Sequence, residues 1–597
     1  MTTQETPQKP RDRWITGVCL ALLALWMSLH GHHRGGVLVG LALTLGATLG
    51  LLGLMGDSPL DTRGDERPLG DGDARPWWQR EGALVVLFGA LLYLPLAGAY
   101  GLWDPWETHY SEVAREILSR DDWITLWWAQ EGWFMSKPIL VFWMGALGMG
   151  VGTLFGGSYM ADQGPSVQEW FIRGPICALA IAALYALYRA VARAWNPRAG
   201  LLVAMVLATM PQWFFLAHQA MTDMPFVAPL VLAMSALMLA LTSDPEALVE
   251  ARALTLAGRT FRVSLWHFAV GLFLVLVLPQ ITYLLTRPLV MVCPADADTA
   301  QCSMALARAH IGSIQLPIET FYSGSAGNSS VEGVAASVPG SPRWERVAAA
   351  ATFFPSVMQG FMWLALLWGA LATLQRERRV QSLHFVLFYL WCAVSTMGKG
   401  PAGLAIPGAV ALLHFASTWR WRELTRIRLG LGITVFLLVG MPWYVAVTGR
   451  LGNEFLQRFV VHDLINRATL GVHGDTGSVR YFLWQLGYAM FPWSGVVPVA
   501  LMGWRVVVPR EATPAQRDVA RMGLLWFALA FVLFSAMITK FHHYIFPALP
   551  GAAIVVGLLL DRLLGPADAT RSLAERVRPL AALTGSLVLA VVGAAYL

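Results

Sequence analysis

Long apolar stretches recur along the whole chain and are separated by shorter polar segments. A helix needs about 20 residues to cross the roughly 30 Å hydrocarbon layer of a bilayer, and these stretches approach that length. They show no strand-like alternation, and a bilayer tolerates no unpaired backbone, so helical spans are expected. The apolar runs lie near residues 14–30, 36–55, 83–100, 138–156, 173–190, 198–216, 224–242, 264–285, 351–373, 382–397, 401–417, 429–448, 482–503, 521–539, 544–563 and 579–597. This pattern predicts an all-α polytopic membrane protein.

Basic segments between the apolar runs predict which ends of the helices face the cytoplasm. Lysine and arginine are enriched in the cytoplasmic loops of membrane proteins. The basic connections of this chain are residues 188–200, 250–262, 374–381, 419–428 and 505–521. We therefore expect these five connections to lie together on the cytoplasmic side.

The run at residues 138–156 decides whether that arrangement is consistent. If the N-terminus is inside, the five basic connections share the cytoplasmic side only if this run does not span the membrane. Its four glycines and the preceding Ser136-Lys137-Pro138 favour a re-entrant or surface-lying segment. Residues 101–172 are therefore expected to form one loop region on the external face, with surface helices.

The amino-acid composition also indicates a membrane protein and limits the kinds of partner that it can have. Of the 597 residues, 56% are hydrophobic and 13% are charged, which is about half the charged share of soluble domains. The net charge of +6 is expected from basic cytoplasmic loops. No basic tract or zinc-finger spacing indicates nucleic-acid binding. We expect an integral inner-membrane protein surrounded by membrane lipids.

The chain is expected to have three parts. Residues 1–80 would form an N-terminal anchor hairpin and a cytoplasmic linker, and residues 81–565 the transmembrane core. Residues 566–597 would form a cytoplasmic loop and a last apolar span. The chain ends within that apolar run, which leaves a continuation open.

An insertion interrupts the core at residues 287–350, which are rich in Gly, Ser, Ala and Pro. It is expected on the external face. Cys293 and Cys302 flank a polar segment within it. A structural disulfide between them is compatible with an external location, since disulfides persist in oxidising compartments; two free thiols remain the alternative.

Two acidic residues, Asp104 and Glu107, follow the apolar run at 83–100 and precede an amphipathic stretch. Apolar residues recur at helical spacing over Glu107–Arg120, and tryptophans surround this segment. Acidic side chains at a helix start are stabilised by the helix dipole. Capping and a functional role are therefore both open for these two carboxylates.

Asp223 stands between two apolar runs joined by almost no loop. Ionisable groups at such a boundary are costly and usually functional, although a simple turn is the alternative. Lys137 and Lys399 each lie beside Pro or Gly between apolar runs, where a lone lysine often only snorkels to the interface. Further polar side chains expected on the same face are Arg467, Lys540 and His543. Their convergence predicts an external polar site beside lipid.

Several motifs occur in the order found in a known family. They are "LWDPWETHYSEVAREIL", "DWITLWW", "SKPIL", "MTDMPF", "GKGPAGLAIPGAVALLH", "FLQRFVVHDLINR" and "YIFPALPGAAIVVG". From about residue 83 to 565 the chain resembles the C-type (GT-C) glycosyltransferases. Within them it is most similar to the aminoarabinose lipid A transferases and the dolichyl-phosphate-mannose protein mannosyltransferases.

The resemblance implies a multi-span helical enzyme that takes a sugar from a polyprenyl-phosphate donor. The sugar would pass, with inversion, to a lipid A, glycan or protein acceptor on the periplasmic face. Asp104 or Asp223 would be the general base, with Glu107 orienting a partner, and the three acids could hold a divalent metal. Side chains expected to bind the donor phosphate are Lys137, Lys399, Arg467, Lys540 and His543.

Two departures weaken the metal and sugar assignments. Family members commonly carry adjacent acids, Pro-Asp-Glu, where this chain has Pro105-Trp106-Glu107, and Ser136 replaces an acid of some relatives. A transporter or flippase for an anionic lipid-linked substrate is the alternative function. Secondary transporters usually show two related halves, whereas no second copy of "WDPWE" or "TDMP" occurs.

Overall fold

The computed structural model describes most of the predicted core. The described residues are 36–55, 76–153, 165–292, 356–470 and 477–564, without 121, 129, 131, 257–258, 288 and 479, together with short pieces at 18–20, 22, 67–68, 303–306, 308–311, 314–317, 320–321, 347–348 and 584–585. Cys293 and Cys302 lie outside the described residues, so their pairing stays a prediction.

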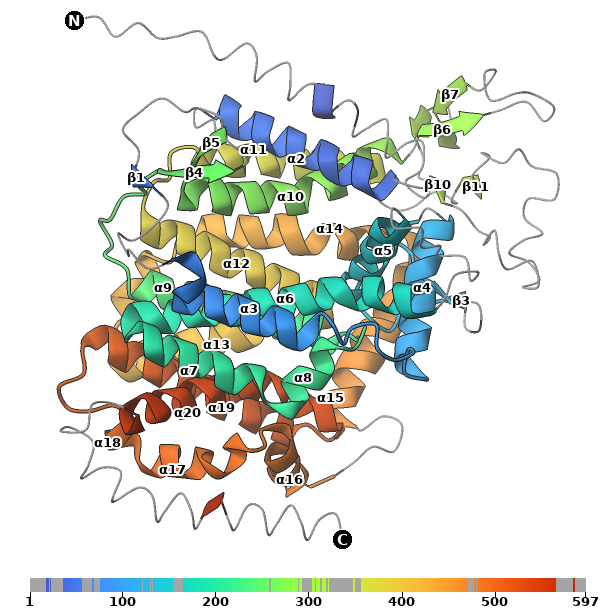
Figure 1. The fold of residues 1–597 in the computed structure, drawn as a ribbon. Coiled ribbons are helices and arrows are strands. Elements are labelled where there is room, and N and C mark those ends of the chain that lie inside the picture. Colours follow the sequence, from blue (N-terminus) through green and yellow to red (C-terminus); the bar gives the residue numbers. More distant parts are fainter. Residues whose placement is uncertain are drawn as a thin grey trace, which may run out of the picture.

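Helices dominate the described part of the chain (Figure 1). The α-helices are α2 (Gly36–Leu54), α3 (Glu81–Tyr93), α4 (Trp106–Arg120), α5 (Leu140–Gly152), α6 (Pro165–Ala194), α7 (Pro197–Ala208), α8 (Pro211–Ala217), α9 (Asp223–Leu241), α10 (Leu265–Thr286), α11 (Ser356–Leu374), α12 (Val380–Lys399), α13 (Ala402–Thr418), α14 (Leu429–Phe455), α15 (Arg467–Thr469), α16 (Arg480–Ala489), α17 (Val497–Met502), α18 (Trp504–Val507), α19 (Pro514–Ala536) and α20 (Leu549–Leu563). A π-helix, η5, spans Leu456–Asn466, and 3₁₀-helices are η1 (Trp77–Gln79), η4 (Trp421–Thr425), η6 (Trp493–Gly495) and η7 (His542–Ala548).

Strands are short and lie outside the helical core. They are β1 (Arg67–Pro68), β2 (Trp127–Trp128), β3 (Gly132–Trp133), β4 (Arg252–Leu256), β5 (Arg259–Val263), β6 (Leu289–Val292), β7 (Ser303–Leu306), β8 (Arg308–Ile311), β9 (Ile314–Pro317), β10 (Thr320–Phe321) and β11 (Val347–Ala348). All pair antiparallel except β1 with β4. The β4–β5 hairpin was not anticipated, because its basic sequence was interpreted as a cytoplasmic loop.

Nine helices within the described residues are long and apolar enough to cross a membrane. They are Val37–Leu54, Gln168–Ala194, Asp223–Leu241, Leu265–Thr286, Ser356–Leu374, Val380–Lys399, Leu429–Thr469, Pro514–Ala536 and His542–Leu563. Each overlaps an apolar run of the sequence. The predicted all-α polytopic membrane protein is thereby confirmed.

Prolines break two of the predicted spans. The run at 198–216 is two helices, α7 and α8, that meet at 70°, because Pro211 has no N–H to continue the hydrogen-bond ladder. The run at 482–503 is divided into α16, η6 and α17, with Pro492 and Pro498 at the breaks. The run at 138–156 contains α5, whose 13 residues extend about 20 Å. Helix α3, in the run at 83–100 that was expected to span, has the same length, so the non-spanning character of 138–156 stays a prediction.

The centre of the bundle is formed by α9 and α12. All residues of α9 except Leu239 are buried, and α12 is also largely buried. An ideal Cβ on Gly398 of α12 would lie 2.6 Å from the carbonyl oxygen of Pro225. The missing side chain thus lets the end of α12 approach the start of α9 closely.

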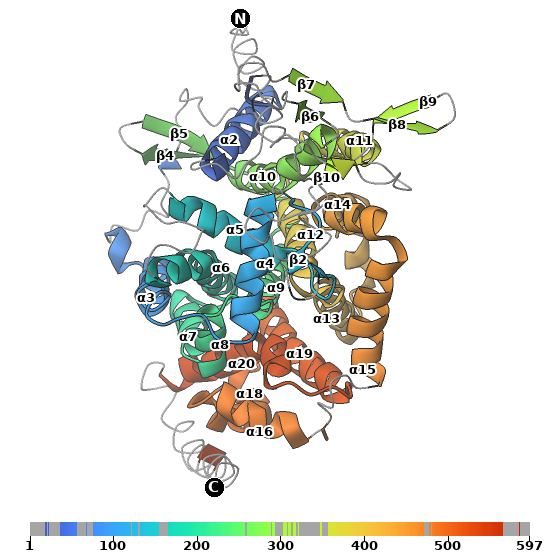
Figure 2. The same cartoon turned by 90° about the vertical axis from the view of Figure 1, so that its right-hand side faces the viewer.

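Helix α4 lies across the ends of the spanning helices instead of beside them (Figure 1). Figure 2 looks onto this end of the bundle, with α4 in front of the spans. The predicted apolar face of α4 is buried: Tyr110, Val113, Ala114, Ile117 and Leu118 are each at most 5% exposed. The prediction of an amphipathic surface helix in the first long loop is confirmed.

The basic connections lie at the opposite end of the bundle from α4. Helix α12 runs from Val380 to Lys399, and α9 runs back from Asp223 to Leu241. The arginines at 376–379 therefore lie at the far end from Asp223 and Lys399. The same alternation places the arginines before α7, before α14 and before α19 at that far end (Figure 1).

Candidate functional site

Asp223 and Lys399 meet where the start of α9 touches the end of α12. The Lys399 ammonium lies 2.5 Å from Oδ1 of Asp223, and the two residues are 176 positions apart in the chain. Ser395 donates a hydrogen bond of 2.8 Å to the Phe226 carbonyl and fixes the register of the two helices. The Asp223 side chain is 3% exposed and that of Lys399 is 25% exposed. The lysine therefore reaches from the buried acid toward the surface.

The π-helical segment η5 contributes a second acid–base pair. Long π-helices are rare and often mark functional sites. Its Asp463 accepts a hydrogen bond of 2.6 Å from Nη2 of Arg467, and Nη1 of Arg467 donates to the Tyr544 hydroxyl at 3.1 Å. Tyr544 also lies under the Lys399 ammonium, 5.1 Å from the ring centre. Tyr544 therefore joins the two pairs into one cluster.

Lys137 approaches this cluster from the loop before α5. Its Nζ lies 3.9 Å from Oδ1 of Asp463 and donates a hydrogen bond of 3.3 Å to the Ser136 carbonyl. Burial lowers the pKa of Lys137 to about 8; Asp463 opposes that shift, while Arg467 and Lys399 add to it. Because the Lys137 ammonium has so few hydrogen-bond acceptors, it can bind an anion at little cost in free energy.

The loop that carries Lys137 is anchored to the bundle. The Asp122 carboxylate pairs with Arg450 of α14 at 2.6 Å, and both side chains are 1% exposed. Trp443 of α14 donates from Nε1 to the Ile124 carbonyl at 2.8 Å. These contacts hold the segment between α4 and α5 against α14 and so position Lys137.

An aromatic stack flanks Lys137. The His109 ring stacks on Trp128, with centroids 3.6 Å apart and planes 20° apart, and Phe134 meets the same ring edge-on at 4.7 Å. Burial, with the nearby charge of Lys137, lowers the pKa of His109 to about 4. The imidazole is neutral at pH 7 and does not compete with Lys137 for an anion.

His543 completes the cluster on the side of Asp223. Its Nε2 lies 3.9 Å from Oδ1 of Asp223. The cluster thus gathers Asp223, Lys399, His543, Tyr544, Asp463, Arg467 and Lys137. Five of the predicted site residues are among them: Asp223, Lys137, Lys399, Arg467 and His543.

Glu107 does not face this cluster. Its carboxylate is fully buried and forms a two-pronged ion pair with Arg173, with two N···O distances of 2.7 Å. The remaining acceptor positions take the backbone N–H groups of Trp103 at 2.9 Å and Ala220 at 2.7 Å. With all its acceptors occupied, Glu107 holds the start of α4 against the turn before Asp223.

Asp104 lies on the exposed surface. Its Oδ1 accepts a hydrogen bond of 2.9 Å from the Thr108 hydroxyl. No contact with Asp223, Lys137 or Lys399 occurs among the described residues. The structure therefore separates Asp104 from Asp223, with which it was expected to share a site.

Lys540 is turned toward its own backbone. Its ammonium donates to the carbonyls of Ser535 at 2.8 Å, of Phe534 at 3.4 Å and of Met537. Cations near helix C-termini commonly satisfy the last carbonyls. All three N–H groups are used in this way, so Lys540 has no donor left for a phosphate.

The acids do not form a metal site. No group of three or more His, Cys, Asp or Glu side chains suited to a metal ion is found within the described residues. Asp104, Glu107 and Asp223 are separated as described above, and the Glu107 oxygens already accept four hydrogen bonds. These residues do not fit the divalent ion that was considered from the sequence.

Sequence reasoning missed two partners and undervalued a third. Arg173 is a cation at the start of the apolar run at 173–190, 66 residues from Glu107, and a charge at such a boundary was a usable signal. Asp463 was given no role from the sequence, although it lies four positions before Arg467. Nothing in the sequence marked Tyr544 as a site residue except its position next to His543.

Gly398 offers a direct test of how the site is assembled. An alanine Cβ there would lie 2.6–2.9 Å from backbone atoms of Pro225 and Phe226, so the two helices must separate. We expect Gly398→Ala to destabilise the protein by about 1–3 kcal/mol and to draw Lys399 away from Asp223. Gly408→Ala is the matched control, since its Cβ would meet nothing within 4 Å. Equal thermal unfolding of the two variants would contradict this role.

Comparison with known proteins agrees with this architecture. No family model matches the chain. It is similar to undecaprenyl phosphate-alpha-4-amino-4-deoxy-L-arabinose arabinosyl transferases of Pseudomonas paraeruginosa (34% identical over 235 residues, 39% of this chain and 40% of that protein) and Pseudomonas aeruginosa (33% over 202 residues, 34% and 35%). The matches thus cover about 40% or less of those relatives.

A solved structure matches over a longer part of the chain. It is ArnT from Cupriavidus metallidurans bound to undecaprenyl phosphate, with a TM-score of 0.50 and 20% identity, covering 83% of this chain and 62% of that one. This chain therefore has a multi-span helical fold similar to that of ArnT. The partial matches to aminoarabinose transferases agree with the resemblance inferred from its motifs.

Proposed function

We propose that the protein is a membrane glycosyltransferase that moves a sugar from a polyprenyl-phosphate donor to an acceptor at the face that carries α4. The observation that carries this proposal is the single cluster in which three cations, Lys137, Lys399 and Arg467, surround Asp223 and Asp463. The relatives named above act on an undecaprenyl-phosphate-linked aminoarabinose, and ArnT has been solved with undecaprenyl phosphate. Whether the sugar is a pentose or a hexose is left to experiment.

The balance of charge favours an anionic donor. Lys137, Lys399 and Arg467 face two carboxylates in the cluster, and the neutral His109 adds no charge. A fourth cation, Arg458, lies 3.8 Å from Oδ2 of Asp463. A phosphate between them would bring the local charge toward zero. Lysines would act as point charges, whereas Arg467 offers a planar fork suited to phosphate oxygens.

The reaction follows from these positions. A hydroxyl or amine of the acceptor attacks the anomeric carbon, a base takes its proton, and the bond from that carbon to the phosphate oxygen breaks. Polyprenyl phosphate leaves with one additional negative charge, which the three cations stabilise. Preorganised charges of this kind are often the largest contribution to catalysis. Attack opposite the leaving group inverts the anomeric carbon.

Asp223 is the proposed general base. Its Oδ1 is occupied by Lys399, and the carboxylate stands at the edge of the cluster beside His543. Positioned bases contribute roughly 10²–10⁴-fold to a rate. Asp463 is proposed to position Lys137 and Arg467. Its Oδ2 accepts no hydrogen bond within the described residues and lies 3.8 Å from Nε of Arg458.

The proposed acceptor side is the periplasm, with the protein in the inner membrane. The support is the position of the basic connections between helices, which lie at the end of the bundle opposite the cluster, as expected for cytoplasmic loops. The acceptor class is a lipid such as lipid A, another glycan, or a protein.

Release of the carrier in detergent tests the proposal and separates it from transport. Purified protein is mixed with a labelled polyprenyl-phosphate sugar and lipid A in micelles, where no compartment exists to transport into. A transferase releases free polyprenyl phosphate and forms a labelled acceptor. A flippase leaves the donor intact, and that result with lipid A, glycan and peptide acceptors alike would refute the proposal.

The pKa of Lys137 gives the reaction a predictable pH dependence. The ammonium is charged below about pH 8 and is lost above it, so kcat/KM for the phosphodiester donor should fall as pH rises through 8. The fall approaches about tenfold for each further pH unit, because kcat/KM reports the groups of the free enzyme. Lys137→Arg keeps its charge throughout this range and should remove the fall. An identical fall in the arginine variant would assign the titration to another group.

A further inference from the structure

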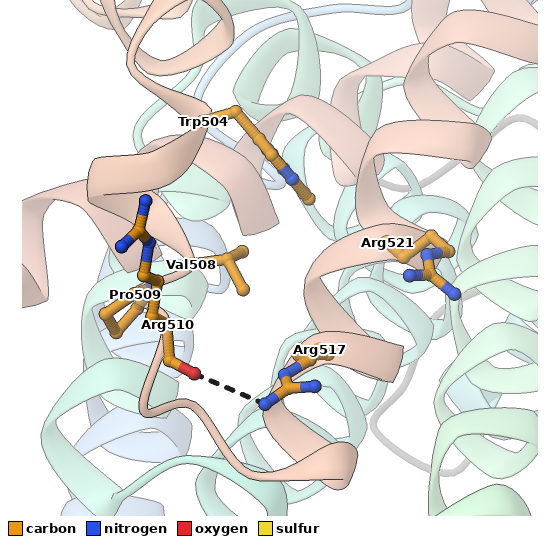
Figure 3. Close-up of a pocket in the computed structure, with 6 residues that line it drawn as sticks. All are labelled: Trp504, Val508, Pro509, Arg510, Arg517 and Arg521. Atoms are coloured by element: carbon orange, nitrogen blue, oxygen red, sulfur yellow. Dashed lines mark hydrogen bonds between the residues drawn. The ribbon is translucent and has the colours of Figure 1, made fainter.

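A pocket lined by arginines lies at the end of the bundle away from the proposed active site. It has a volume of about 350 Å³ and is lined by Trp504, Val508, Pro509, Arg510, Arg517 and Arg521 (Figure 3). Helix α18 and the segment that follows it form one wall, and the first turns of α19 form the other. Helix α19 ends at Ala536, shortly before His543. One helix therefore connects the pocket to the face that carries the cluster.

The positive charge of this pocket is not neutralised by its own lining. No acid is among the lining residues, and no ion pair of Arg510, Arg517 or Arg521 is formed within the described part of the chain. Between lining residues, a side-chain hydrogen bond runs from Nη2 of Arg517 to the Arg510 carbonyl, at 3.3 Å (Figure 3). That contact holds the two walls together and leaves both guanidinium charges in place.

The acids nearest in sequence are directed elsewhere. Asp518 follows Arg517 directly but is buried on another face of α19, where it pairs with Arg420 at 2.6 Å. Its other oxygen lies 3.5 Å from the ring of the buried His414. Asp518 thus neutralises Arg420 and not the arginines of the pocket. Glu511 is exposed, outside the lining.

The surroundings of the pocket are apolar and interfacial. Trp504 stands over it (Figure 3), and tryptophan favours the boundary between headgroups and hydrocarbon. In the preceding helix α17, Met502 is 69% exposed and Leu501 is 37% exposed. A ligand held by the arginines would therefore have exposed apolar surface beside it.

We propose that this pocket binds the phosphate headgroup of an anionic glycerophospholipid of the surrounding membrane. A preference for basic residues on one side of the membrane accounts for arginines at this end, but not for three of them around one hollow beside a tryptophan. Basic pockets between spanning helices on the cytoplasmic side are typical sites for acidic lipid headgroups. The lipid's acyl chains would lie along Leu501 and Met502. Such a lipid would brace α18 against α19.

The test uses the full chain, purified in neutral detergent, with phosphatidylglycerol and phosphatidylcholine as probes and native mass spectrometry as the readout. The wild type should retain phosphatidylglycerol in preference to phosphatidylcholine. Each substitution Arg517→Gln or Arg521→Gln should weaken phosphatidylglycerol binding about fivefold, as expected from the energy of one basic residue near anionic lipid. Arg505→Gln is the matched control, because Arg505 lies on α18 at the same end but does not line the pocket.

Several results would overturn the proposal. Equal retention of the two lipids by the wild type would do so without any variant, so misfolding of a variant cannot hide the answer. An equal loss in Arg505→Gln would mean diffuse surface attraction instead of a site. Displacement of phosphatidylglycerol by equimolar glycerol 3-phosphate would mean that the pocket takes a free phosphate and not a lipid.

Discussion

Asp223→Asn is expected to lower sugar-transfer turnover by about 10²–10⁴-fold, the contribution of a positioned general base. The asparagine amide is similar in size, but it cannot accept the acceptor's proton and carries no charge to hold the Lys399 ammonium at 2.5 Å. Turnover is measured as release of polyprenyl phosphate from a labelled donor. Donor binding should change less than turnover, because Lys137 and Arg467 remain.

Asp561→Asn is the matched control for this prediction. Asp561 is also a buried carboxylate in an ion pair, 2.6 Å from Arg198, but it lies on α20 at the end of the bundle away from the cluster. A general cost of breaking a buried ion pair would affect both variants. Turnover of Asp223→Asn equal to that of Asp561→Asn would remove Asp223 from the chemical step.

Glu107→Ala is expected to have the largest effect on stability. Glu107 and Arg173 are both fully buried, and removing one partner of a buried ion pair leaves an uncompensated charge that costs about 3–5 kcal/mol. The Trp103 and Ala220 N–H groups also lose their acceptor. The measurement is thermal unfolding in detergent, and turnover should fall with stability because Ala220 precedes the Asp223 turn.

Asp104→Asn distinguishes the roles of the two acids in the "WDPWE" motif. Asp104 is exposed, and surface substitutions of this kind change stability by about 0.5 kcal/mol or less. We expect its thermal unfolding to match that of the wild type. A Glu107→Ala protein that unfolds like the wild type but is inactive would contradict the structural role and restore the catalytic one expected from the sequence.

Much of the fold was predictable because spans and surface helices follow from local patterns. The buried face of α4 followed from helical spacing. Pro211 and Pro492 are evident in the sequence, but the helix breaks at these residues were not predicted, because an apolar run has the same composition whether or not it is broken. The β4–β5 hairpin was hidden by its basic residues, which fit a cytoplasmic loop equally well.

The candidate site was predictable in its members more than in its pairings. Asp223 and Lys399 were recognised because each interrupts apolar sequence, but their contact joins positions 176 residues apart. Lys540 and Lys399 look alike in sequence, yet one is bound to backbone carbonyls and the other to a carboxylate. Glu107 was assigned a catalytic role from its motif because its partner, Arg173, lies in a distant helix. The sequence shows which residues are charged, whereas the tertiary packing decides which charged residues pair with one another.

The central claim is that Lys137, Lys399 and Arg467 together hold the phosphate of a polyprenyl-phosphate donor. A cryo-electron microscopy structure of the protein with bound polyprenyl phosphate tests it most directly. The account predicts phosphate density within hydrogen-bonding distance of these three side chains. A phosphate found away from all three, for example in the arginine pocket beside Trp504, would contradict it.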